Sequence, residues 1–105
     1  MGAALADSQR SPATINIQSV RVYPNPWRSD RGYPSQMTFD QMTPNSTVKI
    51  FTISAHYVRT LQAPSGSVPW DLKNENGDRV ASGIYLFLAT DDHGNKARGK
   101  FAVIR

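Results

Sequence analysis

The sequence predicts an all-β domain built as a two-layer sandwich of about seven short antiparallel strands. Three observations support this prediction. Short segments in which apolar and polar residues alternate recur along the chain, and residues that favour turns separate them at regular spacing. No window of about eleven residues or more shows helical periodicity with capping residues. At 105 residues the chain can bury one modest core, so we expect a single domain.

Composition and the N-terminal segment limit the class of protein. Cysteine is absent, which excludes a disulfide framework and a thiolate metal site but leaves the compartment open. No apolar run approaches the roughly 20 residues of a membrane-spanning helix. Residues 1–13 lack periodicity, so we expect a disordered linker there and a folded domain over residues 14–105. Because the opening residues lack the basic start of a signal peptide, an export signal would belong to a larger parent chain with domains upstream.

The first predicted strand changes phase along its length. Ile15 and Ile17 alternate with polar residues, and the apolar set then shifts by one position to Val20 and Val22. Because strand side chains alternate with a period of two, this shift predicts a bulge or a move between sheets.

Two prolines end this strand in the segment Tyr23-Pro24-Asn25-Pro26, because proline cannot donate to a strand ladder. We interpret the segment as a rigid structural motif, with a recognition element as the alternative. A loop is expected over Trp27–Ser35. Its Trp27, Arg28, Arg31 and Tyr33 are candidates for stacking a sugar or a base. The simpler interpretation packs Trp27 on the sandwich and pairs Asp30 with an arginine.

The middle of the chain predicts a series of further strands. They are Met37–Phe39, Ser46–Ile53, Tyr57–Leu61 and a strand containing Val68, Trp70 and Leu72. In the second of these strands, apolar residues on both faces predict that both faces are covered. Pro69 predicts an edge or a bulge. The clearest turn is Asn74–Asp78. Short strands at this spacing are typical of an immunoglobulin-like or fibronectin-III-like sandwich.

The last predicted element is a hairpin of residues 83–90 and 96–105. Because its second strand reaches the final residue, we expect no further domain after it. In the second strand, Ala97, Gly99, Phe101 and Val103 point to one face, and burying Phe101 and Val103 would contribute about 2 to 3 kcal/mol each. Lys96, Arg98 and Lys100 then face solvent as a basic stripe. The stripe either prevents edge-to-edge pairing or docks onto an acidic receptor surface or an anionic lipid.

Six short motifs occur in order between Val20 and Arg105. They are Tyr23-Pro24-Asn25-Pro26, Thr47-Val48-Lys49-Ile50-Phe51, Val58-Arg59-Thr60-Leu61, Trp70-Asp71, the segment from Asn76 to Tyr85, and Lys100-Phe101-Ala102-Val103-Ile104-Arg105. Together they resemble the immunoglobulin-like domain of flagellar hook-capping proteins and the type A C-terminal sorting domains of type IX secretion cargo.

The resemblance implies a domain at the C-terminus of a larger exported protein. It implies recognition by the outer-membrane secretion machinery and processing by a sortase that attaches the cargo to the surface. By the same resemblance, Gly83 and Tyr85 form a Gly-x-Tyr motif, and Lys100 and Arg105 belong to a terminal basic-apolar motif. From the residues themselves, Gly83 is expected to allow close backbone approach, and Tyr85 to be a core residue with one hydroxyl partner.

The sequence departs from the family pattern at three positions. Ala55 stands where the family usually has Gly, Thr52 where it commonly has Asp, and Leu72 where it commonly has Gly after the Trp-Asp pair. We expect either that the turn at Ala55 avoids positive φ or that Ala55 adopts it at a cost of about 1 kcal/mol.

Several function classes lack support in the sequence. We expect no nucleic-acid binding, because no reader motif is present. We expect no enzyme activity, because His56 and His93 fit no nucleophile-base-acid pattern. Oxygen-bearing residues in two turns are explained by turn formation, and we expect no metal or cofactor. These residues are Asp91, Asp92 and Asn95 in one turn and Asn74, Asn76 and Asp78 in the other.

Three functions remain compatible with the sequence. The first is a non-catalytic sorting domain of an exported protein, monomeric as an isolated domain, that passes through the periplasm to the cell surface or medium. The second is a purely structural spacer or subunit contact. The third is a module that binds carbohydrate or another surface ligand through the loop after Pro26.

Overall fold

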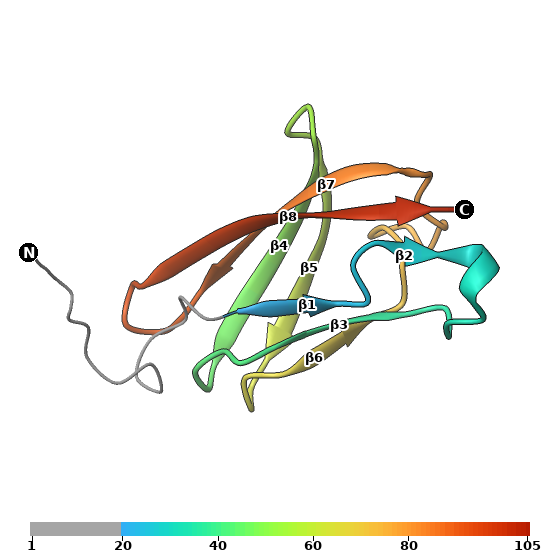
Figure 1. Ribbon diagram of the computed structural model, residues 1–105. Helices are drawn as coiled ribbons and strands as arrows, with labels where there is room; N and C mark the ends of the chain where they lie inside the picture. Colours follow the sequence, from blue (N-terminus) through green and yellow to red (C-terminus); the bar gives the residue numbers. More distant parts are fainter. Residues whose placement is uncertain (1–19) are drawn as a thin grey trace, which may run out of the picture.

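The computed structural model describes residues 20–105, and Figure 1 shows them as a β-sandwich. The predictions for residues 1–13, for the start of the domain at residue 14 and for Ile15 and Ile17 lie outside the described residues. The strands are β1 (Arg21–Tyr23), β2 (Trp27–Arg28), β3 (Met37–Asp40), β4 (Ser46–Thr52), β5 (Tyr57–Ala63), β6 (Val68–Trp70), β7 (Gly83–Thr90) and β8 (Lys96–Ile104), and a 3-10 helix, η2 (Ser29–Arg31), follows β2.

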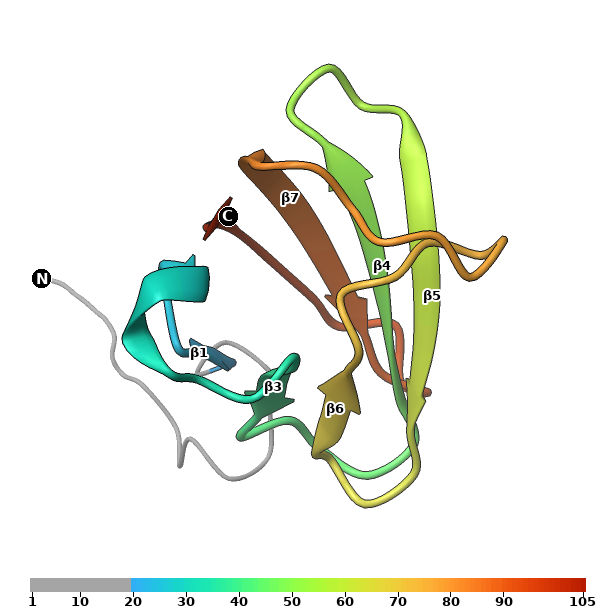
Figure 2. The ribbon, with the colours of Figure 1, turned by 90° about the vertical axis from the view of Figure 1, so that its right-hand side faces the viewer.

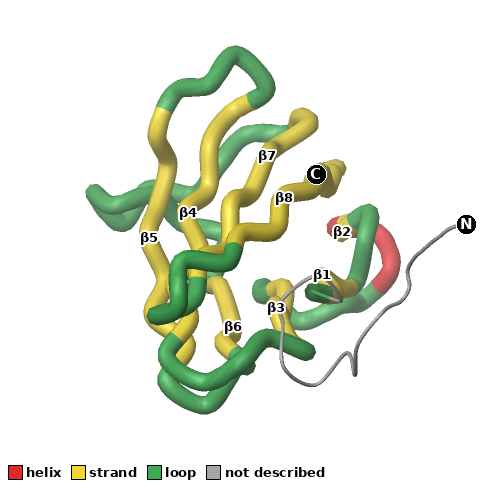
Figure 3. Tube along the Cα trace, turned by 90° about the vertical axis from the view of Figure 1, so that its left-hand side faces the viewer, coloured by secondary structure: helices red, strands yellow, loops and turns green. Residues whose placement is uncertain are grey.

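The strands form two sheets. The smaller has the order β1-β3-β6, and the larger has the order β2-β8-β7-β4-β5. Figure 2 shows the smaller sheet on one face of the larger, and Figure 3 shows β5, β4, β7 and β8 side by side from the opposite direction. The predicted all-β sandwich is therefore confirmed.

The N-terminal strands differ from the prediction in one respect. β1 belongs to the smaller sheet, and β2 belongs to the larger sheet, where it runs parallel to β8. The chain therefore moves between sheets across Pro24–Pro26. The start of the expected loop at Trp27 is consequently a strand, and the described residues contain one parallel pairing among otherwise antiparallel ladders.

The inner faces of both sheets contribute the core. Phe39 lies edge-on to Phe87 and to Phe101, with ring centroids 5.4 and 5.8 Å apart. Trp70 is fully buried, and its ring lies edge-on to Phe101 at 5.6 Å. Such aromatic pairs stabilise the core beyond the area that they bury. Other fully buried side chains include Met37, Val48, Ile50 and Ala63.

The prediction that β4 is covered on both faces is wrong. Val48 and Ile50 point into the core, but Phe51 is only half-buried and Ile53 is 59% exposed. The smaller sheet covers only one face of the larger sheet (Figure 2). The apolar residues Phe51 and Ile53 of this segment therefore belong to the outer surface of the larger sheet. The edge prediction for Pro69 is confirmed, because β6 lies at the end of its sheet.

Two of the departures from the family pattern coincide with left-handed backbone. Ala55 has φ +71° and Leu72 has φ +64°. Ala55 is exposed in the connection from β4 to β5, whereas Leu72 is 1% exposed. Glycine would fit both backbones without strain, but at Leu72 it would also remove a buried side chain.

Replacing Ala55 with glycine is expected to stabilise the domain by about 1 kcal/mol, because glycine removes the left-handed strain and no contact is lost. Leu72→Gly is expected to destabilise the domain, because the free energy lost with the buried leucine side chain exceeds the free energy gained by relieving the backbone strain. Urea denaturation measures both. The control is Ala102→Gly, which places glycine in the extended β8 and should destabilise by about 0.5 to 1 kcal/mol. A loss of stability in Ala55→Gly would contradict this account.

Candidate recognition surface

The final hairpin of β7 and β8 has the alternation that the sequence predicts. Phe101 and Val103 are buried, and Lys96, Arg98 and Lys100 are exposed on the opposite face. Every residue of β7 has a partner in β8, from Gly83 opposite Val103 to Thr90 opposite Lys96. β8 is thus an integral strand of the larger sheet, and its basic stripe faces solvent.

β8 is an edge strand over only part of its length. β2 pairs with it only at Val103 and Ile104. Just before these residues, the Asn25 side chain accepts a hydrogen bond from the Ala102 N–H (3.1 Å) and donates one to the Lys100 carbonyl (3.4 Å). Asn25 and β2 therefore occupy the outer backbone edge of β8 from Lys100 to Ile104, and Arg98 of the basic stripe precedes this occupied part.

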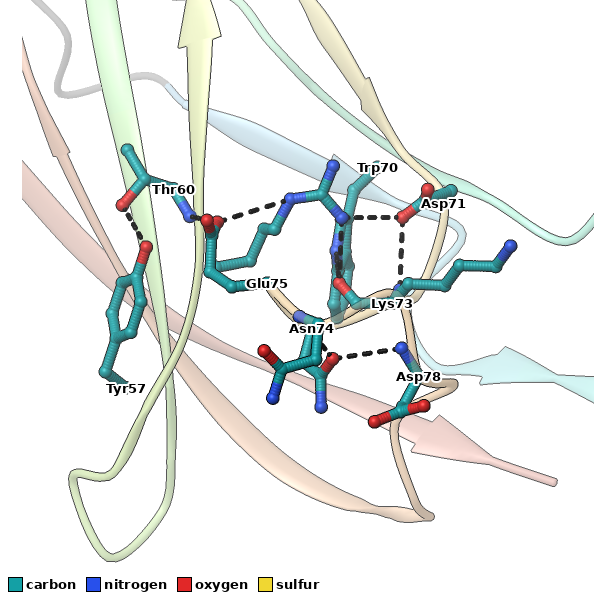
Figure 4. Close-up of polar contacts among 10 residues, drawn as sticks. Tyr57, Thr60, Trp70, Asp71, Lys73, Asn74, Glu75 and Asp78 are labelled. Carbon is teal, nitrogen blue, oxygen red and sulfur yellow. Dashed lines mark hydrogen bonds and ion pairs between the residues drawn. The ribbon is translucent and has the colours of Figure 1, made fainter.

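The opposite edge of this sheet is covered by the loop after β6. The Glu75 N–H donates to the Val58 carbonyl (3.0 Å), and the Thr60 N–H donates to the Glu75 carboxylate (3.2 Å). Arg59 pairs with Asp71 (3.0 Å) and with Glu75 (3.5 Å). Figure 4 shows Asp71, and it shows Glu75 beside Thr60. The edge at β5 is therefore covered by the loop after β6, whereas Asn25 and β2 cover the end of the edge at β8.

The residues assigned by resemblance separate into two places. Tyr85 is buried, its hydroxyl donates to the Ala81 carbonyl (2.5 Å), and its ring stacks on Phe101. Burial raises the pKa of the Tyr85 hydroxyl. Lys100 points to the outer face, so the structure does not bring it together with the Tyr85 side chain. The prediction of a core tyrosine with one hydroxyl partner is confirmed.

Arg105 lies at the same end of the sandwich as Tyr85. Its backbone N–H donates to the Ser82 hydroxyl (2.9 Å), and its Nε donates to the Val80 carbonyl (2.6 Å). Its guanidinium lies 5.3 Å from the centre of the Trp27 ring. Burial lowers the pKa of the guanidinium. These contacts fix the end of β8 to the preceding loop and to β2, which gives Arg105 a structural role.

The glycine requirement of the hairpin lies at a position that the sequence did not indicate. A Cβ on Gly83 would meet only the Tyr85 ring, at 3.9 Å, so the predicted close backbone approach at Gly83 is wrong. A Cβ on Gly99 would lie 2.7 Å from the Phe87 ring. Gly99 stands opposite Phe87 in the pairing of β7 with β8, so the Phe87 ring fills the space that a side chain at position 99 would need. The sequence could not indicate this contact, because it does not specify the register of the two strands.

The segment after the second proline packs against the sandwich. Trp27 is 4% exposed, and its Nε1 donates to the Pro34 carbonyl (2.8 Å). Arg28 pairs with Asp30 (2.9 Å). Arg31 and Tyr33 are exposed, but the Trp27 ring is covered. The candidate stacking platform therefore lacks its main aromatic ring, and the packing interpretation is confirmed.

The segment Tyr23-Pro24-Asn25-Pro26 connects the two sheets, and both of its X-Pro peptide bonds are cis. The Tyr23 hydroxyl donates to Asp40 (3.1 Å), which also pairs with Arg21 (2.8 Å). The hydrogen bond from Arg21 holds the pKa of the Asp40 carboxyl below its usual value. With Asn25 bonded to β8, these contacts support the structural interpretation of the motif.

The turn between β7 and β8 is organised by Asp91. One carboxylate oxygen accepts the backbone N–H of His93 and of Asn95, each at 2.9 Å, and the other accepts the Asn95 amide (3.0 Å) and the Thr43 hydroxyl (3.3 Å). Burial alone would raise the pKa of Asp91, but these hydrogen bonds outweigh it and lower the pKa. Although Asp91, Asp92 and His93 lie close enough to hold a cation, the Asp91 oxygens already serve the turn.

Comparison with known protein families and with curated proteins finds no match to this chain. Among solved structures, PorZ is described as an essential bacterial surface component of the type IX secretion system of Porphyromonas gingivalis. It is 32% identical with a TM-score of 0.72, over 83% of this chain and 12% of PorZ. The chain is an immunoglobulin-like β-sandwich similar to part of a type IX secretion component.

Two further structures are more distant. Latent PorU from P. gingivalis is 23% identical with a TM-score of 0.61, over 81% of this chain and 9% of PorU, and this likeness supports the fold alone. FlgD from Xanthomonas campestris, described as essential for hook capping in flagellar assembly, is 21% identical with a TM-score of 0.49, over 82% of this chain and 67% of FlgD. The chain thus spans a small fraction of PorZ and PorU. Over residues 20–105, no helix has the length and apolar character to cross a bilayer.

Proposed function

We propose that this chain is a non-catalytic sorting domain, which the type IX secretion machinery or its sortase recognises during export of a larger protein. The observation that carries the proposal is the similarity to PorZ, which combines 32% identity with a TM-score of 0.72 over most of the chain. The domain would follow upstream domains of its parent protein. It would pass through the periplasm to the cell surface or medium.

The physical basis of recognition is a rigid sandwich that displays its final hairpin. β8 is held by β7 along its length, by Asn25 at Lys100 and Ala102, and by the Arg105 contacts at its end. A receptor that binds the exposed face of β8 meets a preorganised surface, so binding costs little conformational entropy. Unfolding the sandwich would remove the surface while leaving the sequence intact.

Export of a reporter tests this proposal. The whole chain is fused to the C-terminus of a periplasmic reporter in a host with type IX secretion, and the reporter is measured in periplasm, surface and medium. We expect the reporter to reach the surface or medium. A fusion ending at Asp92 lacks β8 and should leave the reporter in the periplasm, as should a host that lacks the secretion system.

A substitution that keeps the fold provides a positive control for export. Ala55→Gly should retain the fold and therefore the export. Retention of the intact fusion in the periplasm would contradict the proposal, and so would equal export of the intact and shortened fusions.

A further inference from the structure

The outer face of the larger sheet carries apolar and basic side chains in rows that cross β4, β7 and β8. The strand registers align two such rows, which are Phe51–Leu86–Lys100 and Lys49–Leu88–Arg98. Each row therefore runs from β4 through an apolar residue of β7 to a basic residue of β8. We call these six residues the outer basic-apolar face.

The outer basic-apolar face is hollowed. A recess of about 460 Å³ is lined by Phe51, Leu86, Leu88, Arg98 and Lys100, together with Phe87 and Gly99. A second hollow of about 400 Å³ shares Lys100 and is lined further by Ile53 and Ile84. Ile53 and Ile84 are 59% and 46% exposed. Contiguous exposed apolar surface with a polar rim marks interaction sites on soluble proteins.

The described residues do not neutralise the charge on this face. None of the five strands of the larger sheet contains an acidic residue. Within residues 20–105, three other arginines are paired with carboxylates: Arg21 with Asp40, Arg28 with Asp30, and Arg59 with Asp71 and Glu75. The side chains of Lys49, Arg98 and Lys100 have no carboxylate partner among the described residues. The face thus joins an apolar recess to uncompensated positive charge.

We infer that the outer basic-apolar face docks an acidic segment of a partner protein that inserts an apolar side chain into the recess. The carboxylates of the partner would pair with Arg98, Lys100 and Lys49, and its apolar side chain would contact Leu86, Leu88 and Phe51. The inference deepens the proposed function by naming the surface and the chemistry of the partner, and it rests on that function only for the identity of the partner.

Charge and shape distinguish this occupant from two others. A second copy of the chain docked face to face would bring Arg98 and Lys100 of both copies together, and like charges oppose such an interface. A lipid surface binds best to apolar side chains that protrude into the headgroup region. Here Phe51, Leu86 and Leu88 are half-buried around a recess, which suits a protruding side chain from a protein partner.

Peptide binding followed by amide chemical shifts tests the inference on the whole chain. The probe is a hexapeptide with a central Leu-Phe pair flanked on each side by two glutamates. We expect it to shift amides of β4, β7 and β8 around the recess, and the shifts to weaken with added salt. A peptide with lysines in place of the glutamates should cause no shifts there.

Charge reversal supplies the matched comparison. Arg98→Glu combined with Lys100→Glu is expected to weaken binding of the acidic peptide by about tenfold or more. Arg31→Glu combined with Lys73→Glu changes the net charge equally at exposed sites away from the face, and it should leave the affinity close to that of the unmodified chain. Leu86→Thr tests the apolar part and should weaken binding without altering charge. The amide spectra report in the same experiment whether each variant is folded.

Three outcomes would overturn the inference. They are no amide shifts around the recess, equal weakening of peptide binding in both double variants, or stronger shifts of the same amides with phosphatidylglycerol vesicles, which would identify a lipid surface.

The reporter assay separates failure of this inference from failure of the proposed function. If a reporter fusion that carries Arg98→Glu and Lys100→Glu is exported normally, the domain acts in sorting but does not need this surface. If the acidic peptide binds but the intact fusion is not exported, the face is a binding surface and the proposed sorting function is wrong.

Discussion

Trp70→Ala is expected to destabilise the domain by about 3 to 5 kcal/mol, the range for removing a buried large aromatic side chain. Trp70 is 0% exposed, it lies edge-on to the rings of Phe101 and Tyr85, and its Nε1 donates to the Lys73 carbonyl (2.9 Å). Because small domains are stable by only about 5 to 15 kcal/mol, the substitution should remove a large share of the free energy of unfolding. Denaturation followed by circular dichroism measures the loss.

A surface aromatic residue is the control for this substitution. Tyr33 is 39% exposed and lies in the segment after η2, so Tyr33→Ala should cost less than about 1 kcal/mol. The structure would be contradicted if both substitutions had similar effects. Because Trp70 joins the smaller sheet to the final hairpin, Trp70→Ala in the reporter fusion should also reduce export.

Gly66→Ala is expected to cost about 3 kcal/mol, because two effects combine: left-handed backbone strain and a collision with main-chain atoms. Gly66 has φ +85°, and an added Cβ would lie 2.1 Å from the Met42 carbonyl oxygen. The backbone would have to move, which would disturb the hydrogen bonds from the Met42 N–H to Gly66 (3.1 Å) and from the Gly66 N–H to Ala63 (3.1 Å).

Gly77→Ala provides a matched comparison, since Gly77 has nearly the same φ, +84°, but no atom within 4 Å of an added Cβ. It should cost about 1 kcal/mol, the strain alone. The difference between the two variants in urea denaturation measures the collision. Equal losses would show that the chain at Gly66 relaxes without cost.

The local elements of the fold could be predicted from residue types. The alternation in β8 follows from Phe101 and Val103 against Lys96, Arg98 and Lys100, because side chains of a strand alternate between its faces. Prolines mark the end of β1 and the edge strand β6 for an equally local reason, the missing N–H donor. Turn residues at Asn74–Asp78 form the predicted turn, with the Asn74 side chain accepting two backbone N–H groups.

The candidate surface depended on long-range pairing, which a single sequence does not specify. Arg98 was predicted as part of a stripe on one strand, but the row that it forms with Leu88 and Lys49 exists only through the registers of β8 with β7 and of β7 with β4. The same limit explains why β2 was expected as a loop. Its two residues carry no alternation of their own and become a strand by pairing with the end of β8.

The sequence by itself therefore determined the fold class, most strand positions and the outward direction of the basic stripe, since each follows from period-two alternation and turn chemistry within a few residues. Only the tertiary structure decided that Trp27 is buried beneath Arg105 and that Arg105 and Lys100 lie on different parts of the surface. It also decided that the smaller sheet, as described over residues 20–105, covers only one face of the larger sheet. These features depend on which distant strands become neighbours, and that choice is made by the packing of the whole core.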